Sequence, residues 1–208
     1  MGKREVALGR VLLEADLREV QKPAAPRLDD LPAHLQTEIL HLYRVLGGIQ
    51  DQPRLAPGKW DLSFAGFVVE LDEEQHFNQY RLSTLLADWA TDLPWTSDYL
   101  RYSADHEALC SRKASHGGYW TKTSCERLFG PAGPKGDLTS SNGSPRWKQR
   151  ALYDAMKDAY CVAGEVSLAR LSCHDDVGGH LLGTVLDGKA PLDVDALRAL
   201  LETRTPHH

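Results

Sequence analysis

The sequence predicts one α+β domain, and three observations support this prediction. The chain has 208 residues, of which 42% are hydrophobic and 25% charged, as expected for one globular domain with its own core. Residues 59–72 and 166–173 have the composition and alternation of strands. Several longer segments instead place apolar residues at helical spacing. A hairpin, a separate strand and several helices together indicate an α+β fold.

Two amphipathic helices are expected before the hairpin. The first covers residues 5–20 and ends at the two prolines of residues 22–26. The second begins at Asp30, a residue type that can cap a helix, and ends near Leu46, where two glycines follow. Its apolar residues fall on one stripe, as an inward-facing helix requires: Leu35, Ile39, Leu42 and Leu46.

The remaining elements follow the hairpin. Residues 73–90 and 146–160 are predicted as helices, residues 166–173 as a strand and residues 193–203 as a last short helix. The segment 112–146 is rich in Gly, Ser and Pro and is therefore predicted as mostly loop. We divide the single domain into four parts: an N-terminal helix and linker (1–25), a helix, hairpin and helix (26–90), a basic insertion (101–146) and a C-terminal helix, strand and helix (147–208).

The stretch 59–72 is the most regular pattern in the chain. Two strand-like runs flank Ala65-Gly66, which suits a hairpin with a two-residue loop. With this loop Leu62 opposes Val69, and Asp61 opposes Glu70. Alternation then predicts an apolar face of Trp60, Leu62, Phe64, Phe67, Val69 and Leu71, and an opposite face of Lys59, Asp61, Ser63, Val68, Glu70 and Asp72.

Three carboxylates therefore share one face of the hairpin. Directly opposed like charges destabilise a strand pair, so Asp61 and Glu70 require an explanation. A divalent cation would explain them, because hard cations bind carboxylate oxygens, and so would a proton shared by the two carboxyl groups. The alternative is a solvent-exposed face. We favour the cation because Glu70 directly follows the apolar run Phe67-Val68-Val69, where a strand leaves a core.

These residues resemble the active-site motif of the PD-(D/E)xK nucleases, which have a restriction-endonuclease-like fold. The motif has an acid on one strand and (D/E)-x-K on the next strand of the same hairpin. Trp60-Asp61 matches the first element and Glu70-Leu71-Asp72 the second. The strand end followed by His76 is also similar to a bacterial subgroup related to very-short-patch repair endonucleases. The blocks WDLSF, VVELDEEQHFNQYR and RWKQRALYDA further resemble a bacterial family with no established activity.

The resemblance implies a mixed central sheet flanked by helices, with a metal site on the hairpin. Asp61, Glu70 and Asp72 would bind Mg²⁺ or Mn²⁺, and the Leu71 carbonyl could add a ligand. Asp72 stands where the motif has lysine. Because that lysine normally helps to activate the attacking water, an inactive fold remains an alternative.

The resemblance also implies roles for other residues near the hairpin. Lys59 or Lys148 could replace the missing lysine. His76 would orient water or contact phosphate, and its alternative is an ordinary surface histidine. Glu38, on the preceding helix, could be the additional acid often present in this fold, or a solvated helix residue.

A basic helix start provides the candidate contacts to nucleic acid. Gln149 and Tyr153 share a helix face at i, i+4 spacing and resemble the QxxxY element of RecB-type exonucleases. The cations around them suit a phosphate backbone, although a basic helix start is also common. The predicted nucleic-acid contacts are Arg146, Lys148, Gln149, Arg150, Tyr153 and Lys122.

The formal net charge of −5 does not exclude a nucleic-acid partner, because the charge is unevenly distributed. Residues 101–157 contain ten Lys and Arg against five Asp and Glu, a balance of +5, so the rest of the chain carries −10. Trp120 and Trp147 lie among these cations. The basic segment is either a solvated insertion or a surface that faces phosphates.

Neither a membrane span nor secretion is indicated. No apolar run approaches the roughly 20 residues of a membrane span, and acidic residues interrupt the N-terminus too early for a signal peptide. Four cysteines without CxxC spacing suggest reduced thiols. We therefore expect a cytoplasmic protein.

The function predicted from these observations is a Mg²⁺-dependent DNA endonuclease that acts in phage defence, restriction or DNA repair. One alternative is a catalytically inactive nuclease-like module that binds DNA or a protein. Another is an unrelated α+β interaction protein. The expected partners are DNA and either a second copy of the chain or a partner protein of a defence system.

Overall fold

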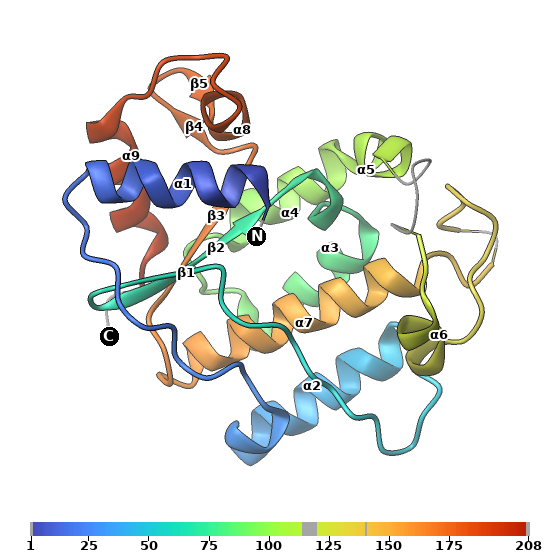
Figure 1. Cartoon of the computed structure of the whole chain (residues 1–208). Helices are drawn as coiled ribbons and strands as arrows, with labels where there is room; N and C mark the ends of the chain where they lie inside the picture. Colours follow the sequence, from blue (N-terminus) through green and yellow to red (C-terminus); the bar gives the residue numbers. More distant parts are fainter. Residues whose placement is uncertain (1, 114–119, 140, 207–208) are drawn as a thin grey trace.

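A small mixed sheet lies between two groups of helices in the computed structural model, which describes residues 2–113, 120–139 and 141–206 (Figure 1). The helices of these residues are α1 (Lys3–Glu14), α2 (Ala33–Val45), α3 (Gln79–Leu85), α4 (Thr96–Asp105), α5 (Glu107–Lys113), α6 (Thr123–Phe129), α7 (Pro145–Val162), α8 (Leu182–Leu186) and α9 (Val194–Arg204). The strands are β1 (Leu62–Phe64), β2 (Phe67–Asp72), β3 (Leu168–Ser172), β4 (Asp176–Val177) and β5 (His180–Leu181). Short 3-10 helices are η1 (Leu28–Asp30), η2 (Glu74–His76) and η3 (Asp88–Ala90). The predicted single α+β domain is confirmed.

Strand β2 is the centre of the three-stranded sheet. It pairs antiparallel with β1, and Leu62 lies opposite Val69, so the predicted hairpin register is confirmed. In the connecting turn Gly66 has a φ of +100°, a conformation that glycine adopts without strain. On its other side β2 pairs parallel with β3, which places Glu70 opposite Arg170. Strands β4 and β5 form a separate pair.

Apolar clusters cover both faces of this sheet. On one face α1, α8 and α9 pack against Val69 and Leu71. On the other face a larger cluster, with α7 among its helices, packs against Val68. Because side chains alternate along β2, Glu70 and Asp72 point to the same side as Val68, towards α7. The two carboxylates are therefore enclosed, with exposed fractions of 4% for Glu70 and 1% for Asp72.

Helix α7 packs against the face of the sheet towards which Glu70 and Asp72 point. Ser144 begins it, because its hydroxyl accepts the Trp147 N–H, and Pro145 occupies the first turn. Leu152 and Met156 anchor the helix in the larger cluster with no exposed surface. Figure 1 shows α7 between the sheet and α2, so α2 lies on the side away from the hairpin acids.

The N-terminal helix is shorter than the predicted segment 5–20. Helix α1 ends at Glu14, and Asp16 adopts a φ of 63°. The chain then runs along the hairpin, where the Val20 N–H donates to a β1 carbonyl and the Arg18 carbonyl accepts from the turn. This pairing covers the open edge of β1, and it outweighs the local helical pattern.

One further local prediction is wrong, and another needs an addition. The helix expected over 73–90 is divided into η2, α3 and η3, because the Asn78 side chain accepts two backbone N–H groups and starts α3 anew. Most described residues of the segment 112–146 are loop, as predicted, but the segment also contains α6, whose Phe129 packs against Tyr43 at a ring distance of 5.4 Å. Its residues 114–119 and 140 lie outside the described part. Helices α4 and α5 had no predicted counterpart.

The predicted faces of the hairpin also need one correction. Trp60 was expected beside Leu62, but it belongs to the larger cluster with Val68. The ladder with β2 starts only at Leu62, so strand alternation does not extend back to Trp60. Its indole instead donates to the Ala24 carbonyl at 3.0 Å.

Several elements match their predictions closely. Helices α2, α7 and α9 and strand β3 lie within two residues of the boundaries expected for them, the start of α2 excepted. The four cysteines are buried and free among the described residues, as reduced thiols would be. None of the described helices is long and apolar enough to cross a membrane.

Candidate functional site

A cleft of about 440 Å³ lies beside the hairpin, between the start of α1 and one face of α7. Charged side chains of both signs dominate its lining. The lining residues are Gly2, Glu5, Gly58, Lys59, Asp61, Glu70, Leu71, Glu73, His76, Arg146, Arg150, Asp154 and Lys157. A cleft of this composition suits a ligand that carries phosphate, a metal cation, or both.

Reciprocal hydrogen bonds hold Asp61 and Glu70 together. The Asp61 N–H donates to Glu70 Oε1 at 3.0 Å, and the Leu71 N–H donates to Asp61 Oδ2 at 3.0 Å. Burial and the Asp61 carboxylate raise the pKa of Glu70 to about 8, and burial also raises the pKa of Asp61. The opposed acids are thus enclosed, and the alternative of a solvent-exposed face is wrong.

Lys157 provides the ammonium group that faces Glu70. Its Nζ lies 2.6 Å from Glu70 Oε2 and donates to the Lys59 carbonyl at 3.2 Å. The two side chains are 9% and 5% exposed, so the ion pair is buried. The same ammonium lies 5.5 Å from the centre of the Trp60 ring. The cation beside the acid pair therefore comes from α7, whereas the Lys59 side chain is exposed at the rim.

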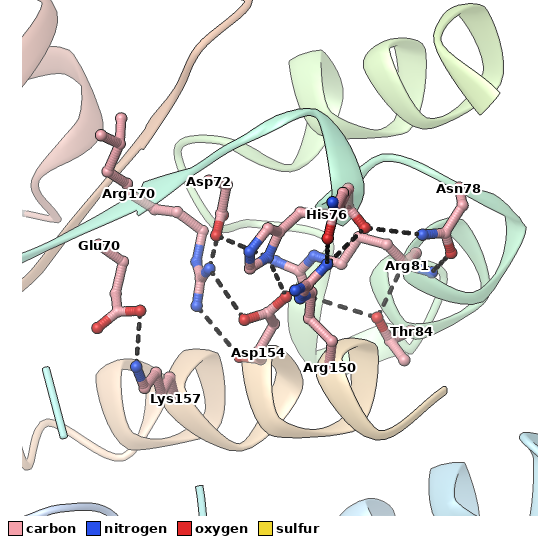
Figure 2. A network of polar contacts seen from close by, with 12 residues as sticks. Glu70, Asp72, His76, Asn78, Arg81, Thr84, Arg150, Asp154, Lys157 and Arg170 are labelled. Atoms are coloured by element: carbon pink, nitrogen blue, oxygen red, sulfur yellow. Dashed lines mark hydrogen bonds and ion pairs between the residues drawn. The ribbon is translucent and has the colours of Figure 1, made fainter. Parts of the chain in front are cut away.

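Asp72 belongs to a second group of side chains. Its Oδ1 lies 3.0 Å from His76 Nδ1, and Asp154 Oδ2 lies 2.8 Å from the same nitrogen. Figure 2 shows the three side chains converging between β2 and α7. Burial disfavours a charged imidazole, but the carboxylates of Asp154 and Asp72 outweigh it and raise the pKa of His76 to about 9.

Arg170 holds this second group in place from the neighbouring strand. It is fully buried, and its Nη1 lies 2.7 Å from Asp72 Oδ2 and 3.6 Å from Asp154 Oδ1. Its Nε donates to Asp158 Oδ1 at 2.9 Å, and the other Asp158 oxygen accepts from Arg81 at 2.7 Å. Burial alone would raise the pKa of Asp72, but Arg170 and His76 hold it well below its usual range.

Asp72, His76 and Asp154 form a buried group that could hold a metal ion, because their ligand atoms all lie within 4.8 Å of one another. Within the described part of the chain, Asp72 Oδ1 is buried and has no hydrogen-bond partner. Among the same residues the predicted ligands Asp61, Glu70 and Asp72 form no such group, since Asp72 turns towards His76. Metal binding by Asp61 and Glu70 stays a prediction.

The structure separates the other predicted residues into two sets. Arg146 and Arg150 line the cleft together with the hairpin acids. The remaining candidates are not among the described residues that line it: Glu38, Lys122, Lys148, Gln149 and Tyr153.

Each of these outlying residues has a different environment. Gln149 and Tyr153 do share a helix face, at 3.4 Å, but Gln149 also contacts Cys125. Lys148 donates to Asn142 at 2.7 Å. Lys122 is exposed at the start of α6. Nucleic-acid binding by these residues stays a prediction.

Three charged residues of the site escaped the sequence-based reasoning: Asp154, Lys157 and Arg170. A helical signal was present for the first two, because Arg146, Arg150, Asp154 and Lys157 follow one another at spacings of four, four and three residues on one helix face. Arg170 has only the weak signal of a cation within an apolar strand.

The chain belongs to a family of unknown function (DUF7255), whose family model matches residues 41–188. The matched segment contains the hairpin, α7 and β3, and therefore both groups of side chains described above. No curated protein and no solved structure matches the chain.

Proposed function

We propose that this member of the DUF7255 family hydrolyses phosphodiester bonds of DNA in the cleft, with Mg²⁺ or Mn²⁺ as its cofactor. The observation that carries the proposal is the meeting of Asp61, Glu70 and Lys157 in one cleft, which Arg146 and Arg150 also line. Two acids and a cation are the elements of the PD-(D/E)xK motif that the hairpin resembles. Here the cation comes from a helix and not from the strand.

The residues of the cleft can divide the reaction among them. Arg146 and Arg150 would hold phosphates, because guanidinium groups match phosphate oxygens. The ionised form of Glu70 can accept a proton from water, and its pKa, raised to about 8, predicts that this base becomes more available as the pH rises from 7 to 8. Lys157 would then stabilise negative charge that develops on the phosphate. A bound divalent cation would add Lewis-acid polarisation of the phosphate.

The proposal includes a cytoplasmic role in restriction, phage defence or DNA repair. This part rests on the resemblance of the hairpin to restriction-endonuclease-like and very-short-patch repair enzymes. A homodimer, or a complex with a partner protein of a defence system, would place two clefts or a second activity on one DNA molecule.

One observation favours a second candidate, an inactive nuclease-like module that binds DNA or a protein. Glu70 is already paired with Lys157, and Asp72 with Arg170. Buried carboxylates that are neutralised by the protein's own cations do not need a metal ion. In this case binding would persist without cleavage.

Cleavage of plasmid and branched DNA in Mg²⁺ or Mn²⁺ tests the proposal directly. Glu70→Gln removes the proposed general base and is expected to lower the rate at least about 100-fold. Asp61→Asn, at a predicted metal ligand, should lower the rate as well. Asp51→Asn is the matched control, because this carboxylate is fully exposed on a distant loop and should leave the rate unchanged. Full cleavage by both cleft variants would overturn the proposal, and DNA binding without cleavage would support the inactive module.

A further inference from the structure

The convergence of Asp72, His76 and Asp154 needs a chemical explanation. The two carboxylate oxygens lie 3.0 and 2.8 Å from one imidazole nitrogen, His76 Nδ1. This nitrogen carries at most one proton, which can form one linear hydrogen bond. Asp154 takes that bond, and Asp72 Oδ1 is left buried without a hydrogen-bond partner in the described part of the chain. Leaving such an oxygen unsatisfied costs about 1–3 kcal/mol, and more for a charged group.

The other oxygen of each of these two carboxylates, which does not face His76, already contacts a cation. Arg170 contacts Oδ2 of Asp72 and Oδ1 of Asp154, so the oxygens that face His76 are the two left over. Arg170 is itself fixed by Asp158, which is fixed by Arg81. Shells of this kind orient the first ligands of metal sites. The arrangement therefore presents two oxygens and one nitrogen inward, with a fixed cation behind them.

One further positive charge, either a proton on His76 or a metal ion, would balance the ionised groups of the buried network. Four of its carboxylates are buried (Glu70, Asp72, Asp154 and Asp158), against three buried cations (Arg81, Lys157 and Arg170). With all four carboxylates ionised and a neutral imidazole, one negative charge would be in excess. A proton on His76 would remove this charge but would leave Asp72 Oδ1 without a hydrogen bond. A metal ion would contact all three ligand atoms at once.

The distances agree with a metal site. In an octahedral complex with bonds of about 2.1 Å, adjacent ligand atoms are about 3 Å apart, and the two measured separations are 3.0 and 2.8 Å. An ion could also reach the site, because His76 and Asp154 line the cleft and the His76 side chain is 20% exposed. Asp72 is buried and is not among the described residues that line the cleft.

We propose that Asp72, His76 Nδ1 and Asp154 bind a first-row transition-metal dication, with Mn²⁺ preferred to Mg²⁺. Mg²⁺ favours oxygen ligands and keeps its water, whereas an imidazole nitrogen favours transition metals. The inference rests on the proposed function only in assigning this ion to the chemistry of the cleft. The site is separate from the Asp61 and Glu70 pair, which faces Lys157.

Titration of the metal-free full chain with Mn²⁺ tests the proposal. Binding is measured as the loss of the electron paramagnetic resonance signal of free Mn²⁺. One Mn²⁺ per chain is expected, and Mg²⁺ should compete at least about tenfold more weakly. His76→Gln and Asp154→Asn should each weaken Mn²⁺ binding at least about tenfold, in keeping with the cost of altering a metal site. Asp51→Asn is the matched control, a fully exposed acid outside the cleft, and should bind Mn²⁺ as the parent chain does. The double variant His207→Ala/His208→Ala should also bind normally, which excludes the adjacent terminal imidazoles.

Unchanged Mn²⁺ affinity in both ligand variants, or equal competition by Mg²⁺, would overturn the proposal. If circular dichroism shows that a ligand variant is unfolded, the parent chain is labelled with ¹⁵N-histidine and titrated with Zn²⁺ in an NMR experiment instead. A shift of Nδ1 in one internal histidine is then expected, and shifts confined to His207 and His208 would count against the site. Mn²⁺ binding without DNA cleavage would remove the proposed function alone. DNA cleavage by a chain whose Mn²⁺ binding does not depend on His76 would contradict this inference and leave the proposed function standing.

Discussion

Removing the Lys157 ammonium should destabilise the protein mainly through Glu70. Breaking a buried ion pair by removing one partner costs about 3–5 kcal/mol, because the other charge stays buried. Glu70 is 5% exposed, but Lys157 lowers its pKa, so loss of Lys157 should raise that pKa above about 8 and leave the orphaned carboxyl group protonated at pH 7, which favours the lower end of that range. We therefore expect Lys157→Met to lower the free energy of unfolding by about 3 kcal/mol, or the melting temperature by about 6–12 °C.

A double-mutant cycle separates the ion pair from the other contacts of Lys157. The hydrogen bond to the Lys59 carbonyl and the contact with the Trp60 ring do not involve Glu70. They contribute about 1 kcal/mol in total and are lost in either background. In a Glu70→Gln background, Lys157→Met should therefore cost only about 1 kcal/mol, which leaves a coupling of about 2 kcal/mol.

Urea unfolding at pH 7 in the presence of a chelator measures all four proteins of the cycle. Lys189→Met is the matched control, because Lys189 pairs with Asp187 at 3.2 Å but is 71% exposed. An exposed pair of this kind contributes less than about 1 kcal/mol. If Lys157→Met costs the same in both backgrounds within about 0.5 kcal/mol, the ion pair does not stabilise this part of the protein.

Two further predictions concern DNA affinity and pH. If Arg146 and Arg150 bind phosphates, changing either one to Ala should reduce the slope of log affinity against log salt concentration by about 0.9. Arg44→Ala, on α2, is the control and should leave the slope unchanged. Fluorescence anisotropy with duplex DNA measures the slopes. Burial and the stacked His106 ring, 3.7 Å away, lower the pKa of His174 from 6.5 to about 4. Between these pH values the unfolded chain binds a proton that the native protein does not, so stability should fall as the pH decreases, by at most about 3 kcal/mol. Urea unfolding at pH 7 and 4.5 should show a smaller fall in His174→Phe, and an identical fall would contradict the assignment.

The hairpin could be predicted from the sequence because its information is local. A two-residue turn at Ala65-Gly66 and a period of two fix the register, and Leu62 does lie opposite Val69. Helix α7 was equally accessible, since its apolar stripe and its Pro145 start lie within one segment. The burial of the hairpin acids was less accessible, because it depends on helices from both ends of the chain that cover the two faces of the sheet.

The partners of the acids could not be predicted in the same way. Lys157 meets Glu70 across 87 residues of sequence, and Arg170 meets Asp72 across 98. No local period encodes such contacts. They follow from the position of α7 beneath β2 and from the parallel pairing of β2 with β3. The same long-range packing also turns Asp72 away from Asp61 and towards His76.

The cations of this site come from a helix and a neighbouring strand, and not from the strand that carries the acids. In the motif that the hairpin resembles, the lysine follows the second acid by two residues on one strand. Here Asp72 occupies that position, and it is held by Arg170 from the adjacent parallel strand, while Lys157 approaches Glu70 from a helix. A carboxylate at this position can contribute to a metal group in which a lysine could not. Asp72 forms, with His76 and Asp154, the convergent group of ligand atoms beside the acid pair, at a position where the motif that the hairpin resembles has a lysine.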